Sequence, residues 1–183
     1  MDGGKIQNTV TELLALVGEN PERSGLAETP RRVAAFYNEV LSGYRENPLD
    51  YATVFPSEGN NMVLVKDIQF YSLCEHHLVP FFGTVSVAYI PDKKILGLSK
   101  FGRIVDVFAK RLQVQERLTN EILRTLVTIL DPLGCAVKVE ATHLCMSMRG
   151  IKKDDARTVT TAFHGHLESN ENLRKEFLTA TNS

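Results

Sequence analysis

The run Val63-Leu64-Val65-Lys66-Asp67-Ile68-Gln69-Phe70 marks the point at which the sequence changes from helical to strand patterning. Its density of β-branched and aromatic residues is typical of a strand. Later segments repeat this character, with alternation that places one face of each strand against a core. The sequence therefore predicts four strands, at residues 62–70, 84–90, 137–142 and 158–163.

Helical stripes stand before, between and after these strands. Apolar residues recur at helix spacing in residues 10–17 and 33–44, and two further stripes lie at 105–112 and 118–130. The order is helix, helix, strand, strand, helix, helix, strand, strand, and a short polar helix after Glu168. This order favours the α+β class, with a four-stranded antiparallel sheet, two helices on one face of it, and an N-terminal helical appendage.

Turn-forming residues separate the appendage from the rest of the chain. They begin at Asn47-Pro48 and continue through Pro56-Ser57-Glu58-Gly59-Asn60-Asn61. Clusters of this composition between periodic segments are typical of loops. We therefore expect an appendage at residues 1–61 and a main domain at residues 62–183.

The composition of the 183 residues is that of an ordinary globular protein, with 43% hydrophobic and 23% charged residues. Lys and Arg total 21 and Asp and Glu total 22, so no global field attracts nucleic acid or an anionic membrane. No apolar run approaches the length of a membrane span, and the first residues lack the apolar core of a secretion signal. We expect a cytoplasmic protein whose three cysteines stay reduced.

Cys74 and His77 have the C-x-x-H spacing that lets one turn aim both side chains at a single ion, and Cys145 is a third candidate ligand. Three protein ligands leave a tetrahedral zinc ion with an open position for water, which favours hydrolytic chemistry. The alternative is two buried cysteines and a surface histidine that are unrelated in space. His76 and His143 stand beside the two clusters and are candidates for proton transfer, since imidazole titrates near neutral pH.

A basic segment opens the first central helix. Ser99 is placed as its N-cap, and Lys100 and Arg103 add two cations to the free backbone donors of the first turn. That combination suits a phosphate group, although an ordinary capped helix with solvated basic residues has the same pattern. Arg149 begins a second basic cluster soon after Cys145, which favours a polyphosphate substrate if the metal site exists.

Gln115 and Glu116 open the second central helix. A carboxylate in a first helical turn complements the helix dipole and needs no further role. It is also the group that would pair in bidentate fashion with the N1–H and exocyclic amine of guanine. The carboxylate alone does not select guanine.

Several motifs together resemble one known family, GTP cyclohydrolase I. They span nearly the whole chain: 25–30, 73–81, 97–105, 113–119, 143–150 and 174–178. The resemblance implies the tunnelling (T-) fold, a homodecamer of two face-to-face pentamers, and active sites between subunits. It also implies conversion of GTP and water to 7,8-dihydroneopterin triphosphate and formate, the entry step to folate or biopterin synthesis.

The same resemblance implies roles for particular residues. Zinc would be bound by Cys74, His77 and Cys145; protons would be moved by His76 and His143, with Ser99 near the ribose; the base would be recognised by Gln115 and Glu116; and the triphosphate would be contacted by Lys100, Arg103 and Arg149.

Two rival functions fit the same residues less well. One is a non-catalytic purine-binding protein with a structural zinc, but a closed structural site would require a fourth protein ligand. The other is an enzyme that opens GTP and releases a formylated intermediate, or that acts on a related pterin. Release of formate separates these functions.

Overall fold

The computed structural model describes residues 1–182 and divides the chain into two compact units, of which the first is Met1–Ser42. This smaller unit contains helices α1 (Gly3–Leu16) and α2 (Thr29–Val40), which contact each other. The side chain of Asp2 caps α1 by accepting a hydrogen bond from the backbone N–H of Lys5. The helical patterning predicted for the N-terminal part is confirmed.

The larger unit begins at Gly43, so the segment 43–61, which the sequence analysis assigned to the appendage, lies with the main domain. Gly43 donates a hydrogen bond to the carbonyl of Lys110 at 3.0 Å and accepts one from Arg111 Nε at 3.1 Å. The turn residues that indicated a boundary form short elements of this unit instead. These are the 3₁₀ helix η2 (Pro48–Tyr51) and strand β1 (Val54–Pro56), which pairs with β4 (Lys94–Leu96). Another 3₁₀ helix, η1 (Ser42–Arg45), precedes them.

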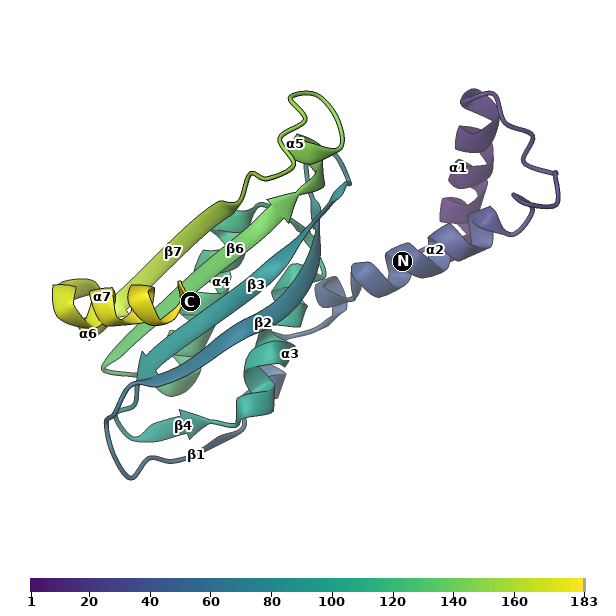
Figure 1. Ribbon diagram of the computed structural model, residues 1–183. Coiled ribbons are helices and arrows are strands. Elements are labelled where there is room, and N and C mark those ends of the chain that lie inside the picture. The colour runs from purple at the N-terminus through teal and green to yellow at the C-terminus, as the bar shows by residue number, and fades with distance from the viewer. Residues whose placement is uncertain (183) are drawn as a thin grey trace. The chain divides into compact units, whose positions relative to one another are not determined.

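The main sheet has five strands in the order β5-β2-β3-β6-β7. Its four long strands are antiparallel and match the four predicted ones: β2 (Val63–Cys74), β3 (Pro80–Ile90), β6 (Gly134–His143) and β7 (Thr158–Gly165) (Figure 1). The prediction of a four-stranded sheet is wrong by one edge strand, because β5 (Leu112–Gln113) pairs in parallel with the end of β2. Two residues between two helices are too few to show a period of two.

Helices α3 (Leu98–Ala109) and α4 (Gln115–Leu130) lie on one face of the sheet, as expected. Their apolar stripes join the inward residues of the strands in the main core, which includes Phe70, Val85, Val137, Ile104, Leu118 and Ile122. Each of these side chains is almost completely buried. At about 25 cal/mol per Å² of apolar surface, this core is the main stabilising term of the larger unit.

The C-terminal helices lie on the face of the sheet opposite to α3 and α4. Figure 1 shows α7 (Glu171–Ala180) in front of the sheet and α4 behind it. Ala136 packs with Leu167 of α6 (His166–Ser169) and with Phe177 of α7, whereas its neighbour Val137 packs in the main core. Successive side chains of a strand point to opposite faces, which explains this division.

Candidate metal and substrate site

A tight turn brings Cys74 and His77 together at the end of β2. The backbone N–H groups of His77 and Leu78 both donate to the carbonyl of Cys74, at 3.3 and 2.9 Å, and Cys74 N–H donates to the carbonyl of Val79 at 2.9 Å. Leu78 completes the turn with a φ of 54°. As a result, Cys74 Sγ lies 3.6 Å from His77 Nδ1.

Cys145 joins this pair from a distant part of the chain. It lies in the short helix α5 (Leu144–Ser147), directly after β6, and β6 is held beside β2 by the intervening strand β3. One ligand atom from each of Cys74, His77 and Cys145 lies within 4.8 Å of the other two. Within residues 1–182, this is the group of metal-ligating side chains that the fold assembles. The predicted convergence of the three residues is therefore confirmed.

The geometry of this group fits zinc. With Zn–S at about 2.3 Å and Zn–N at about 2.05 Å, two ligands of a tetrahedral ion lie about 3.6 Å apart. The distance from Cys74 Sγ to His77 Nδ1 is 3.6 Å. Burial raises the pKa of the Cys145 thiol, and the neighbouring Cys74 raises it further. Two thiolate groups this close together repel each other. A zinc ion bound between them neutralises their charge.

Two histidines border the group. His76 is exposed, and its Nδ1 lies 3.8 Å from Cys74 Sγ. His143 is the last residue of β6, and its ring stacks on Phe81 with centroids 4.7 Å apart and planes 5° apart. Burial lowers the pKa of His143, and the carboxylate of Glu116 opposes that shift. The structure thus places both predicted proton-transfer residues beside the candidate metal site.

Gln115 is buried at the start of α4. The resemblance gives it, together with Glu116, a role in recognising the base, and Gln115 is only 1% exposed. Its amide nitrogen donates to Val139 O at 3.1 Å, to Thr158 O at 2.9 Å and to Thr160 Oγ1 at 3.2 Å. Its amide oxygen lies 2.7 Å from His143 Nε2. Both ends of the amide are therefore bonded within the chain.

Glu116 is exposed in the first turn of α4 and so remains accessible to a ligand. The next residue, Arg117, binds Glu75 in a bidentate ion pair with N–O distances of 2.7 and 3.0 Å. The Arg117 guanidinium lowers the pKa of the Glu75 carboxyl. This pair ties the start of α4 to the turn that holds Cys74 and His77. Sequence reasoning missed it, because 42 residues separate the partners and neither charge stands in a motif.

The basic residues of α3 lie away from the metal-ligating group within one chain. The last turn of α3 leads into β5, which pairs with Cys74, whereas Ser99 and Lys100 are in the first turn. At 1.5 Å per residue, the 12 residues of this helix separate its two ends by about 17 Å. The N-cap is Gly97 and makes no side-chain capping bond, so the expected Ser99 N-cap is wrong. Arg103 is exposed, and its guanidinium lies over the Tyr51 ring at 5.6 Å.

Arg149 lies close to Cys145. It is exposed four residues after Cys145, and its charge lowers the pKa of that thiol against the larger effects of burial and of Cys74. It is therefore the predicted phosphate-binding residue that the chain itself brings to the candidate metal site.

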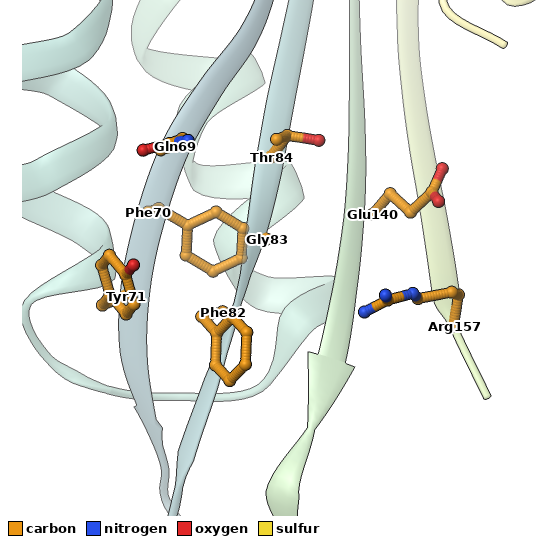
Figure 2. A pocket seen from close by; sticks show the side chains of 8 residues that line it. All are labelled: Gln69, Phe70, Tyr71, Phe82, Gly83, Thr84, Glu140 and Arg157. Carbon is orange, nitrogen blue, oxygen red and sulfur yellow. The ribbon is translucent and has the colours of Figure 1, made fainter. Parts of the chain in front are cut away.

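The opposite face of the sheet carries a separate hollow (Figure 2). There Tyr71 and Phe82 stack with centroids 5.8 Å apart, and Glu140 and Arg157 line the other side. Phe82 follows Phe81, which stacks on His143, so the pleat of β3 sends these two rings to opposite faces. The hollow is therefore not part of the site that His143 borders.

Comparisons with known proteins place this chain in a family. The sequence model described as GTP cyclohydrolase I matches residues 6–182. A protein named "GTP cyclohydrolase 1" from Campylobacter lari is 49% identical over 181 residues, covering 98% of this chain and 95% of the relative. One of the same name from Thermoanaerobacter pseudethanolicus is 50% identical over 185 residues, covering 100% and 98%. The chain belongs to the GTP cyclohydrolase I family.

Among solved structures, the archaeosine synthase QueF-Like in the apo form gives a weaker likeness. The TM-score is 0.48 at 23% identity, and the overlap covers 59% of this chain and 97% of that one.

Proposed function

We propose that the protein is a GTP cyclohydrolase I, which converts GTP and water to 7,8-dihydroneopterin triphosphate and formate at the start of pterin synthesis. Family membership over residues 6–182 supports the reaction. The observation that carries the proposal is the convergence of Cys74, His77 and Cys145 with a histidine on either side.

The metal of this site is zinc, held by the thiolates of Cys74 and Cys145 and by the imidazole of His77. Three protein ligands, soft sulfur donors and one imidazole are the donor set of a catalytic rather than a structural zinc site. When bound, zinc polarises a water molecule and makes it a nucleophile near neutral pH.

The neighbouring side chains supply the proton transfers. His143 donates a proton to N7 of the guanine ring, which gives the adjacent C8 the positive character that attack by water requires. His76 returns and accepts protons as the formyl group leaves and the ribose rearranges, with Ser99 of a second copy of the chain contacting the ribose. Glu116 pairs with the N1–H and exocyclic amine of guanine, because a carboxylate accepts from two parallel donors.

The binding groups for the triphosphate come from more than one chain. Arg149 is near the metal-ligating group, whereas Lys100 is in the first turn of α3, at the end of the helix far from that group, and Arg103 is at the middle of the helix. In this proposal, a second copy of the chain brings its Lys100 and Arg103 to the triphosphate. We propose that the copies form the homodecamer of two pentamers, built on the tunnelling fold, that the resemblance implies.

Subunit mixing tests this shared site. A Lys100→Ala chain and a His143→Ala chain are each expected to be inactive alone. Mixed assemblies regain part of the activity, because some sites then receive both intact contributions. Failure to regain any activity in assemblies shown to be mixed contradicts sites between subunits.

We place the enzyme in the cytoplasm, without nucleic-acid or membrane partners. The thiolates of the site require a reducing compartment. Within residues 1–182, no helix has the length and apolarity needed to cross a membrane.

The reaction is tested by incubating the zinc-loaded protein with GTP and measuring formate together with oxidised, fluorescent neopterin. Formate and pterin are expected in equal amounts, and protein stripped of zinc serves as the control. Binding without turnover would leave a purine-binding protein. Turnover without formate would leave a hydrolase that stops at a formylated intermediate.

A further inference from the structure

We propose that Gln115 is a positioning residue for His143 rather than a contact of the base. It holds the ring so that Nε2–H faces Gln115 and Nδ1 is the nitrogen available to the substrate. The inference rests on the proposed function for the identity of the substrate, but the hydrogen-bond arrangement can be measured without it.

The orientation of the Gln115 amide is fixed by its surroundings. Its nitrogen faces the backbone carbonyls of Val139 and Thr158, at 3.1 and 2.9 Å. A carbonyl oxygen can only accept a hydrogen bond, so the NH₂ group must stand on this side. The reversed amide would place three oxygens against one another in a buried position. The amide oxygen therefore faces His143.

The amide is also held firmly in place. Thr160 Oγ1 lies 3.2 Å from the Gln115 nitrogen and 2.6 Å from Thr119 Oγ1. Thr119 in turn donates to the Gln115 carbonyl at 2.8 Å. These bonds connect α4 with β6 and β7 around a side chain that is 1% exposed. A buried amide with every partner in place resists rearrangement, because each lost bond leaves an unsatisfied polar group.

The consequence falls on the His143 ring. Gln115 Oε1 is an acceptor, so the ring nitrogen 2.7 Å away must be the donor, Nε2–H. Stacking on Phe81 at 4.7 Å fixes the ring plane, and a flip within that plane would turn a C–H toward the amide oxygen. With Nε2–H bound to Gln115, Nδ1 is the ring nitrogen that remains available to the substrate.

Gln115 thus fixes which ring nitrogen of His143 carries the hydrogen. In other active sites, too, the hydrogen bond made by one ring nitrogen sets the tautomer of the histidine. A contact of the base would affect mainly the affinity for GTP. A positioning residue affects mainly the rate of the proton-transfer step. Loss of a contact of the base would therefore raise KM, whereas loss of a positioning residue would lower kcat.

Neutron crystallography of the zinc-loaded wild-type protein above neutral pH tests the arrangement directly. We expect a deuterium on His143 Nε2, none on Nδ1, and the Gln115 ND₂ group facing Val139 O and Thr158 O. A deuterium on Nδ1 with a bare Nε2 overturns the proposal, as does an amide nitrogen facing the ring. This result does not depend on turnover of GTP.

Kinetics of Gln115→Met test the role. We expect kcat to fall at least about 10-fold, a part of what general acid catalysis contributes, with little change in the KM for GTP. The matched control is Gln113→Met, because Gln113 is equally buried at 1% exposure but donates to Phe108 and Glu121 instead of facing the site. It should cost similar stability and keep most of kcat. A raised KM with unchanged kcat in Gln115→Met would assign Gln115 to the base after all.

Discussion

Replacing Cys145 with alanine tests the proposed zinc site on its own terms, since it removes one of three ligands and leaves the turn at Cys74 and His77 intact. Structural zinc sites with four ligands bind with about 10–16 kcal/mol at neutral pH, or about 2.5–4 kcal/mol per ligand. Loss of one ligand should therefore weaken zinc binding by about two to three powers of ten. Activity should be lost with the metal.

Cys135 provides the matched control. It is fully buried, and burial raises its pKa to about 12, so it is neither a ligand nor a thiolate. Cys135→Ala removes a sulfur atom from β6, the strand that leads to Cys145, and should keep zinc, although the small cavity costs roughly 1 kcal/mol of stability.

The assay is competition with a chelator of known affinity, followed by measurement of protein-bound zinc in the wild type and both variants. The expected order of affinity is wild type equal to Cys135→Ala, and both far above Cys145→Ala. Wild-type affinity in a folded Cys145→Ala protein would refute the assignment of Cys145 as a ligand.

Three further predictions concern His143, Gly43 and the reactivity of two cysteines. His143→Ala should keep its zinc and lose about 10²–10⁴ in kcat, the range of general acid–base catalysis; unchanged turnover in a formate assay would make the histidine structural. Gly43→Ala should lower the melting temperature, because a Cβ there would lie 2.0 Å from the backbone oxygen of Val107; an unchanged melting curve would show that this contact relaxes freely. A thiol reagent added to native zinc-free protein should modify Cys145, which is half-buried, and spare Cys135, whose thiol is buried and has its pKa raised to about 12; mass spectrometry of the peptides decides, and rapid labelling of Cys135 would contradict its burial.

Periodic patterns predicted the long elements of the fold. Residues 137–142 alternate strictly, and the structure has β6 there with Val137 and Val139 in the core and Lys138 on the other face. The stripes at 105–112 and 118–130 mark the buried faces of α3 and α4. Alternation and helical spacing are visible in the sequence because burial on one side selects them.

Short elements and tertiary contacts could not be predicted in the same way. β5 has two residues and owes its place to pairing with Leu73 and Cys74. The segment 43–61 has the composition of a linker, and it lies with the main domain through contacts to distant residues: hydrogen bonds to Lys110 and Arg111 and the pairing of β1 with β4. Local propensity carries no information about such distant partners.

In the candidate site, too, local motifs were predictable from the sequence and distant contacts were not. The C-x-x-H spacing indicated Cys74 and His77, because both ligands belong to one turn. Cys145 belongs to no such motif. Its residue type and the nearby His143 indicated a ligand, and the fold confirms that it joins Cys74 and His77. The burial of Gln115 was not predictable, since its bonds reach Val139, Thr158 and Thr160 on two other strands.

The most direct test of the account is a crystal structure of the zinc-loaded protein, measured with anomalous scattering at the zinc edge. We predict one zinc ion bound by two sulfur atoms and one imidazole nitrogen, from Cys74, Cys145 and His77, with its fourth position open to water or to GTP. A fourth protein ligand, or a zinc ion bound away from these three residues, would contradict it.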